Sequence, residues 1–182
     1  MKVMIDPGHG GADPGAVRGA TKESDINLSI ATSAGWLMKQ RGITVAYTRV
    51  SDKFLKPTER VALANASGAD FFLSVHCNAA ENTDARGLEV WHYKTDERGL
   101  VVARAIWQEV MRLPGWVSRQ PGVKASTTNI YVLRMTKMPA ALIECAFVSN
   151  EEDRRLLELP DIRKRVAQGI AEGVAQCAGL FV

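Results

Sequence analysis

Three side chains able to do chemistry stand where predicted strands end. His9 follows the apolar run Val3–Ile5, and His76 closes a second apolar run. Glu144 comes late in a third run of apolar residues. The carboxyl ends of parallel strands meet at one edge of a sheet, so we expect these side chains to converge. Two imidazoles and one carboxylate, with a coordination position left open for water, make a catalytic zinc set.

A second carboxylate, Glu23, follows the first polar loop and can swing back over the same edge of the sheet. A glutamate that does not bind the metal can act as general base toward the metal-bound water. The competing interpretation is an acidic residue that only complements the dipole of the helix it begins. The residues alone leave open which carboxylate would bind a metal.

Glu144 follows the residues Ala140–Ile143, and an ionised carboxylate in such a setting is costly unless it is paired or given a role. The alternative is a structural ion pair with Arg49 or Arg60. For His76 the alternative is a core histidine hydrogen-bonded to the backbone. Both interpretations remain open at this level.

A glycine-rich turn surrounds His9, where Pro7 fixes φ and Gly8, Gly10 and Gly11 permit a sharp change of direction. Such a turn leaves open space around a polar side chain. The alternative is a turn with an incidental histidine.

Cys77 and Cys145 follow His76 and Glu144 directly. Side chains alternate along a strand, so both cysteines should point away from the site and serve as small buried hydrophobic residues. The third histidine, His92, shares a predicted strand face with apolar neighbours, and we interpret it as structural.

Hydrophobic periodicity and turn residues divide the chain into alternating strands and helices. The predicted helices are Glu23–Arg41 (capped by Thr21 or Ser24), Thr58–Ala66, Glu97–Arg112, Asn150–Leu157 and Pro160–Ala178. The predicted strands, besides the first, are Ile43–Thr48, Asp70–His76, Gly87–Tyr93, Ile130–Leu133 and Pro139–Phe147, with a long polar loop over Pro114–Thr128. This alternation predicts an α/β fold with a largely parallel sheet and helices on both faces.

The composition is that of an ordinary globular chain, with 182 residues, 46% hydrophobic residues and 24% charged residues. We therefore expect one domain spanning 1–182. The net charge of +3 comes without a lysine-arginine block, so nucleic acid is not an expected partner. The sequence has no run of about 18 apolar residues, so we expect no membrane span. Three scattered cysteines favour free thiols in a reducing compartment.

The order of several short motifs resembles the zinc-dependent N-acetylmuramoyl-L-alanine amidases of the amidase-3 type, over about residues 2–178. The motifs are Ile5–Gly11, Glu23 with Asn27-Leu28, Thr48-Arg49 with Asp52, Arg60 with Ala64-Asn65, Ser74–Ala79, Pro139–Glu144 and Phe147–Asn150.

The resemblance implies a mixed, mostly parallel six-stranded sheet. It implies Zn²⁺ held by His9, Glu23 and His76, with Glu144 as the catalytic carboxylate. The implied reaction is hydrolysis of the amide between N-acetylmuramic acid and L-alanine in bacterial peptidoglycan. We further expect Asn78 and Arg49 to contact the substrate.

The chain shows no signal peptide, wall-binding repeat or gating helix, and so resembles a bacteriophage endolysin or the excised catalytic domain of an autolysin. We expect a monomer that acts on the bacterial cell wall. It would be made in the cytoplasm and released at lysis, or derive from a secreted autolysin, with a wall-binding domain outside this chain. Two alternatives stay open: a non-catalytic peptidoglycan-binding module, and another zinc peptidase or deacetylase.

Overall fold

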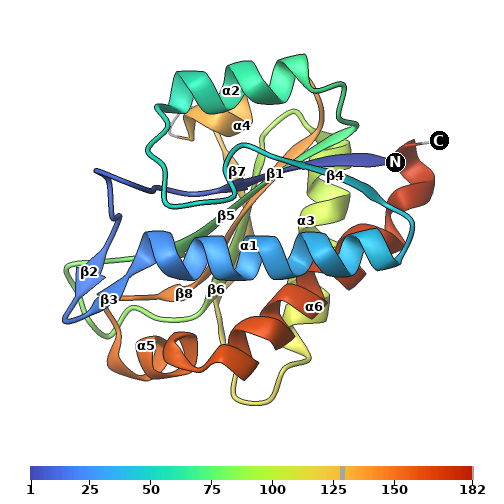
Figure 1. The fold of residues 1–182 in the computed structure, drawn as a ribbon. Coiled ribbons are helices and arrows are strands. Elements are labelled where there is room, and N and C mark those ends of the chain that lie inside the picture. The colour runs from blue at the N-terminus through green and yellow to red at the C-terminus, as the bar shows by residue number, and fades with distance from the viewer. Residues whose placement is uncertain (128–129, 182) are drawn as a thin grey trace.

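A computed structural model describes residues 1–127 and 130–181 and has a six-stranded sheet at its centre (Figure 1). The strand order is β4-β1-β5-β8-β6-β7. The first four strands in this order are parallel, β6 is antiparallel to β8, and β7 is parallel to β6. The strands span Lys2–Pro7 (β1), Thr44–Tyr47 (β4), Phe71–Asn78 (β5), Leu88–Tyr93 (β6), Ser118–Ser126 (β7) and Ala140–Phe147 (β8). The predicted mixed, mostly parallel sheet is confirmed.

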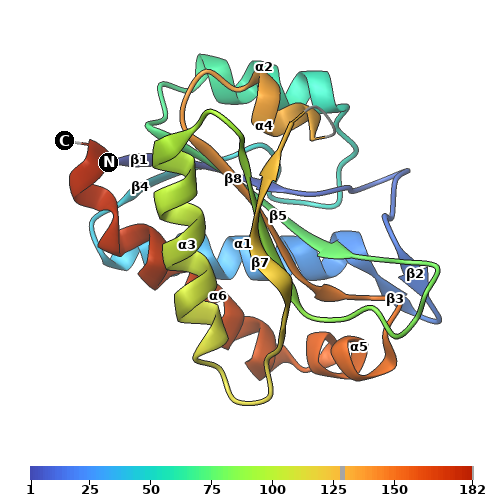
Figure 2. The same ribbon diagram turned by 180° about the vertical axis from the view of Figure 1, so that it is seen from behind.

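Helices cover both faces of the sheet, as predicted (Figures 1 and 2). One face packs against α1, α3 and α6, and the other against α2 and α4. The helices span Glu23–Gln40 (α1), Pro57–Ala66 (α2), Glu97–Met111 (α3), Tyr131–Met135 (α4), Glu151–Glu158 (α5) and Pro160–Gln176 (α6), followed by a 3-10 turn Ala178–Phe181 (η1). A small hairpin, β2 (Val17–Arg18) and β3 (Thr21–Lys22), precedes α1.

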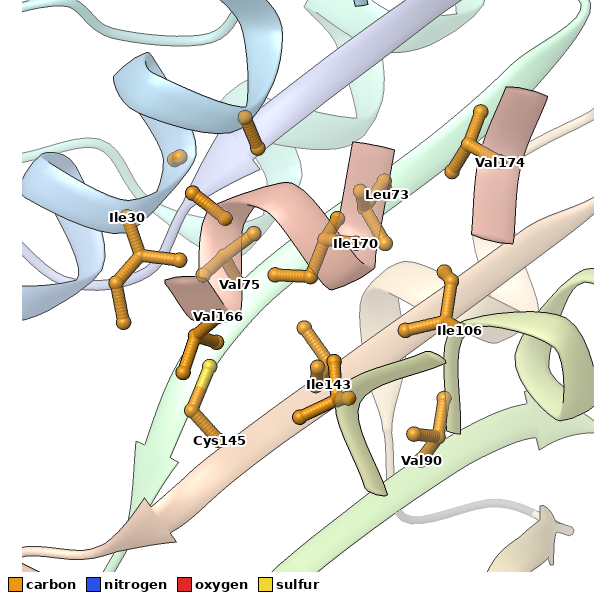
Figure 3. Close-up of a cluster of buried hydrophobic side chains, with 14 of the residues drawn as sticks. Ile30, Leu73, Val75, Val90, Ile106, Ile143, Cys145, Val166, Ile170 and Val174 are labelled. Carbon is orange, nitrogen blue, oxygen red and sulfur yellow. The ribbon is translucent and has the colours of Figure 1, made fainter. Parts of the chain in front are cut away.

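The described residues form two hydrophobic cores, and the larger lies between the sheet and helices α1, α3 and α6. Alternation along the strands decides which side chains enter this larger core. Figure 3 shows Ile30 of α1 and Val166 of α6 packed with Leu73 and Ile143 of the sheet. The residues that precede Leu73 and Ile143 on their strands, Phe72 and Leu142, point to the opposite face of the sheet, where helices α2 and α4 lie. The sheet therefore has an apolar face toward α1, α3 and α6, and it turns the other set of side chains toward α2.

Cys77 and Cys145 lie in the larger core, as predicted, and are almost fully buried. His92 is also buried, with Nδ1 2.9 Å from the carbonyl oxygen of Tyr93. It shares the strand face of Val90, which belongs to the same core. The structural interpretation of His92 agrees with this placement.

Two of the predicted elements are wrong. Residues 118–126, predicted as part of a polar loop ending at Thr128, form the edge strand β7, and Thr128 itself lies outside the described residues. Pro121 suggested a loop, but an edge strand tolerates proline because one side of it needs no partner. The run Ile130–Leu133, predicted as a strand, begins helix α4, because a short apolar run does not separate the two structures by periodicity.

The helix ends agree in part with the prediction. Asn150 caps α5 by accepting a hydrogen bond from the backbone N–H of Asp153 (3.1 Å). Neither Thr21 nor Ser24 caps α1, which starts after Lys22 without a side-chain cap. Across the described residues, no helix combines the length and the apolarity that crossing a bilayer requires.

Candidate metal and catalytic site

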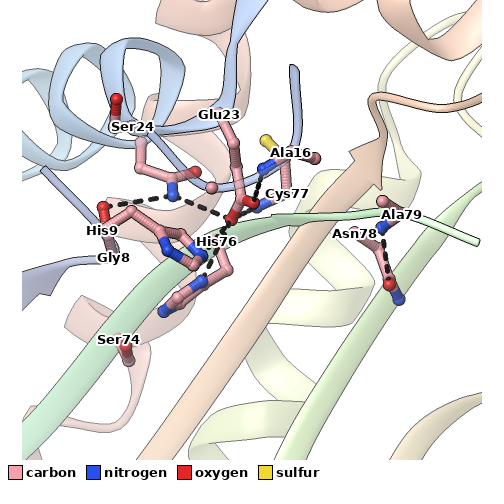
Figure 4. A network of polar contacts seen from close by, with 12 residues as sticks. Gly8, His9, Ala16, Glu23, Ser24, Ser74, His76, Cys77, Asn78 and Ala79 are labelled. Carbon is pink, nitrogen blue, oxygen red and sulfur yellow. Dashed lines mark hydrogen bonds and ion pairs between the residues drawn. The ribbon is translucent and has the colours of Figure 1, made fainter. Parts of the chain in front are cut away.

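The structure brings His9, Glu23 and His76 together at the carboxyl edge of the sheet (Figure 4). Glu23 Oε1 lies 3.2 Å from His9 Nε2 and 3.1 Å from His76 Nδ1. The two imidazole rings meet edge to face, with centroids 5.0 Å apart. One donor atom from each residue lies within 4.8 Å of the other two.

This donor set fits a zinc ion. Zinc binds imidazole nitrogen and carboxylate oxygen at about 2.0–2.2 Å, so two ligands on one tetrahedral ion are about 3.4 Å apart. The separations from Glu23 Oε1 to His9 and His76 are close to that value. Three protein ligands leave one position for water or substrate, as in catalytic rather than structural zinc sites.

Glu23 begins α1, and only 4% of its surface is exposed. Hydrogen bonds from several neighbours fix its carboxylate. Its Oε1 accepts hydrogen bonds from Asn27 Nδ2 (3.1 Å) and the backbone N–H of Cys77 (3.2 Å). Its Oε2 accepts one from the backbone N–H of Ala16 (3.0 Å). Burial alone would raise the pKa of Glu23, but the hydrogen bonds and charges of His76 and His9 hold it far below its usual range. The carboxylate is therefore ionised and ready to bind a cation.

His9 is oriented by a residue that the sequence interpretation missed. Asp13 Oδ2 lies 2.8 Å from His9 Nδ1, which leaves Nε2 directed at Glu23. Burial opposes the charged imidazole, yet the hydrogen bonds and charges of Glu23 and Asp13 raise the pKa of His9. A carboxylate behind a histidine fixes its tautomer and strengthens it as a metal ligand. The turn Asp13-Pro14-Gly15, four residues after His9, was the available signal.

Two buried arginines hold the backbone of the loop that carries His9, whose φ is +57°. Arg60 Nη2 donates to the carbonyl oxygen of His9 (2.7 Å), and its Nη1 donates to Asp6 Oδ1 (2.7 Å). Arg49 Nη2 donates to the carbonyl oxygen of Gly8 (2.7 Å). Left-handed backbone at a residue other than glycine persists only where its surroundings determine it strongly. The two arginines supply such support.

Arg49, expected to contact the substrate, uses all three guanidinium nitrogens on main-chain oxygens: those of Pro7, Ser51, Gly8 and Ser24. Only 4% of its surface is exposed. Asn78 donates from Nδ2 to Glu89 (3.2 Å), and its Oδ1 accepts from the backbone of Ala79. Direct substrate contact stays a prediction for both residues, and the structure gives each a second task in shaping the site.

Gly8 makes room for the His76 ring. A Cβ atom at Gly8 would overlap that ring. We therefore expect Gly8→Ala to lower zinc affinity about 10- to 100-fold, the range typical when the support of a metal ligand is lost. Zinc titration of the purified variant against a competing chelator measures this. Gly179→Ala is the control, since a Cβ there meets no atom within 4 Å. An unchanged affinity in Gly8→Ala would contradict the ring placement.

Glu144 occupies the strand position next to His76. The two residues are register partners on β5 and β8, and Glu89 of β6 is the register partner of Glu144 on its other side. The Oε2 atom of Glu144 is buried and has no hydrogen-bond partner among the described residues. Burial, with the negative charges of Glu23 and Glu89, raises the pKa of Glu144 well above its usual range. The alternative ion pair of Glu144 with Arg49 or Arg60 does not form, because Arg60 pairs with Asp6 and Arg49 donates to main-chain oxygens.

Comparison with known families decides how this geometry is classified. The family model of the N-acetylmuramoyl-L-alanine amidases matches residues 3–176. The chain belongs to this amidase family. The motifs that suggested it at the level of sequence include His9, Glu23, His76 and Glu144, which the structure places at one edge of the sheet.

Known amidases resemble the chain along nearly its whole length. It is 35% identical to an endolysin of Bacillus phage SPP1, covering 98% of this chain and 66% of that protein. It is 33% identical to a sporulation-specific N-acetylmuramoyl-L-alanine amidase of Bacillus subtilis, covering 99% of this chain and 69% of the relative. The chain thus spans just under two thirds of the endolysin's length.

Solved amidase structures share the fold. The catalytic domain of the amidase CwlV from Bacillus (Paenibacillus) polymyxa superimposes with a TM-score of 0.89 at 31% identity, covering 98% of both chains. The amidase CwlD of Clostridioides difficile, solved in complex with the GerS lipoprotein, gives a TM-score of 0.91 at 28% identity, again covering 98% of both chains.

A charged group beside Glu144 in this amidase chain was also missed from the sequence. Glu89 is 3% exposed, and its Oε1 lies 2.6 Å from Lys124 Nζ and 3.2 Å from Arg119 Nε. An ionised Glu89 is costly for the same reason as an ionised Glu144, because Glu89 too is a single charge within an apolar strand. Lys124 and Arg119 lie on β7, which was predicted as a loop, so their approach to Glu89 was not accessible from the sequence.

Proposed function

We propose that this amidase-family chain is a zinc-dependent hydrolase of the amide bond between the lactyl group of N-acetylmuramic acid and L-alanine in peptidoglycan. One observation carries the proposal. His9, Glu23 and His76 present three donors within 4.8 Å of one another, and the Oε2 atom of neighbouring Glu144 has no hydrogen-bond partner in the part of the chain that the structure describes. That arrangement would hold a metal ion next to a proton acceptor.

The side chains of the site divide the work in this proposal. A zinc ion held by His9, Glu23 and His76 supplies Lewis-acid chemistry, polarising a carbonyl and lowering the pKa of a water molecule. Glu144 accepts a proton from the attacking water and returns it to the nitrogen of the departing L-alanine. Burial raises the pKa of Glu144 above its usual range, and this favours uptake of the proton from the water molecule.

Asp13 keeps Nε2 of His9 facing the metal position, and Arg49 and Arg60 hold the loop that carries His9. These residues do not need to touch the substrate to support turnover. A change of about 1 Å in the placement of reacting groups can cost about 100-fold in rate, so a rigid loop contributes directly to activity.

The proposal extends to the place of action. The relatives include a phage endolysin and a sporulation-specific N-acetylmuramoyl-L-alanine amidase, so we propose the bacterial cell wall as the site of action and wall lysis as the outcome. We also propose that the chain is a monomer and that a wall-binding domain lies outside residues 1–182.

Mass spectrometry of purified peptidoglycan after digestion tests the reaction and the cofactor together. We expect stem peptides with a free L-alanine amine, released with added zinc and not with a chelator. Fragments cut within the stem peptide would make the chain a zinc peptidase, and loss of acetyl groups alone would make it a deacetylase. If walls of several chemotypes release nothing while still binding the protein, the chain is a binding module instead.

A further inference from the structure

A groove outside the proposed active site runs between α1 and α6, which lie side by side along the same face of the sheet (Figure 1). Its volume is about 470 Å³. Two contacts between the helices bound it along their length. Arg163 Nε donates to Ser29 Oγ (3.2 Å) at one end, and Arg41 pairs with Glu172 (3.3 Å) at the other. The groove is thus a defined feature of a packed helix pair.

An exposed tryptophan lines the groove. Trp36 is 60% exposed and has Ser33, Leu37 and Gln168 as neighbours along the groove. It is the one strongly exposed large apolar side chain there among the described residues. A stable protein interface buries about 800 Å² per partner around several such side chains. One indole in a pocket of this volume fits a small ring-shaped unit better, since ligand pockets span about 300–1,000 Å³.

Positive charge lines the other wall of the groove. Lys164 and Arg165 project from α6 and are exposed. Lys164 makes a long contact of 3.4 Å with exposed Asp161, and Arg165 has no acidic partner within 4.0 Å among the described residues. Glu172, at the far end, is engaged by Arg41 and Gln168. The groove therefore favours an anionic ligand that also offers a flat apolar face.

The proposed reaction creates such a ligand, so this inference rests on the proposed function. Hydrolysis breaks the C–N bond of the lactyl amide. The oxygen of water stays on the lactyl carbonyl carbon, and the L-alanine nitrogen leaves with the proton. A neutral amide on each muramic acid thereby becomes a carboxylate. The cut glycan strand consists of sugar rings, with apolar C–H faces, that carry negative charges.

We propose that the groove between α1 and α6 binds this peptide-free, carboxylate-bearing glycan. A sugar ring stacks on Trp36, and the lactyl carboxylate pairs with Arg165 and Lys164. An arginine fork matches a carboxylate through two hydrogen bonds. The hydroxyl of Ser33 and the amide of Gln168 lie along the same groove, where they can meet the polar edge of a sugar.

The groove lies along the helix that also carries Glu23, so one glycan strand can reach both the groove and the zinc site. Trp36 and Glu23 lie on the same helix, thirteen residues apart, which is about 20 Å along the axis. A glycan strand longer than this can occupy the groove with a cut segment while an uncut segment reaches the zinc site. The product would then hold the enzyme on a strand that still contains substrate.

The test measures binding of two soluble probes: peptide-free oligomers of alternating N-acetylglucosamine and N-acetylmuramic acid, and neutral N-acetylglucosamine oligomers of the same length. We expect the acidic oligomer to bind at least about tenfold more tightly than the neutral one. Arg165→Glu and Trp36→Ala should each weaken binding of the acidic oligomer by about tenfold or more. Arg98→Glu is the matched control, because it makes the same charge change at an exposed position on α3.

Two activity measurements complete the test. Trp36→Ala and Arg165→Glu should hydrolyse a soluble muramyl peptide like the wild type and should digest intact sacculi more slowly. Absence of acidic-oligomer binding by the wild type, equal binding by all variants, or preference for an acidic peptide would overturn the proposal. If the wild type fails to cleave the muramyl peptide, the proposed function fails, and the binding data still report on the groove separately.

Discussion

Replacing Glu144 by glutamine should lower kcat on muramyl peptide about 100- to 10,000-fold, the range that general acid–base catalysis contributes. Glutamine keeps the shape of the side chain and removes its ability to take up a proton. Zinc content should stay unchanged, because Glu144 is not among the three clustered donors. Steady-state kinetics together with metal analysis of the same sample measure both quantities. Retained turnover would remove Glu144 from the catalytic role.

The same substitution should stabilise the zinc-free protein. The pKa of Glu144 in the folded state lies well above its ordinary value of 4.5. At a pH between the ordinary pKa of the unfolded state and the raised pKa of the folded state, the folded state binds more protons than the unfolded state. Folding stability therefore falls as the pH rises through that window. Glutamine removes this loss. The difference in Tm between Glu144→Gln and wild type should therefore be small below pH 4.5 and grow above it.

Glu109→Gln provides the matched control for losing a buried carboxylate. Glu109 is 6% exposed and lies on α3, which packs against the sheet face opposite to the one from which His76 and Glu144 project. It already accepts hydrogen bonds from Arg112 (2.7 Å) and Gln176 (2.6 Å). Its replacement should leave turnover unchanged and should not raise Tm. A rise in Tm for both variants would mean that the effect at Glu144 does not come from its unpartnered buried charge.

Much of the fold follows from local patterns, because long helices and buried strands carry strong periodicity. The 18 residues of α1 and the apolar strand β5 are of this kind. Edge strands and short helices cannot be predicted from local patterns, because their structure depends on the elements they pack against. The β7 strand exists through pairing with β6, and α4 is a helix of five residues that packs on α2 and the sheet. Neither has a periodic signal of its own.

The candidate site divides in the same way. A histidine at a strand end and a lone charge in an apolar strand are visible in the sequence, which is how His76 and Glu144 were found. Glu23 was different, because a first-turn acid already has an ordinary explanation in the helix dipole. Only the family resemblance, and then the convergence with two histidines, separates the two interpretations. Asp13 lies behind His9, a proposed ligand, where the sequence shows only a turn.

Replacing His76 by alanine should have the largest effect on zinc binding. The substitution removes one of the three proposed ligands, so we expect zinc affinity to fall by more than the roughly 10- to 100-fold typical of losing a supporting partner. Asp13→Asn, which alters only the group behind His9, should fall within that smaller range. Zinc stoichiometry after dialysis against a zinc-buffered chelator measures both, and turnover should decline in the same order.

His92→Ala separates loss of a ligand from loss of a buried imidazole. His92 is buried on the sheet face opposite to the one that carries His76. Its truncation should therefore lower the stability of the fold while the folded protein keeps its zinc. In His76→Ala, Glu23 loses a hydrogen-bonding partner in a site where it is 4% exposed, so the zinc-free form should lose stability as well. Full zinc content in folded His76→Ala would exclude His76 as a ligand. Loss of zinc in both variants would show that burial, and not ligation, controls the metal.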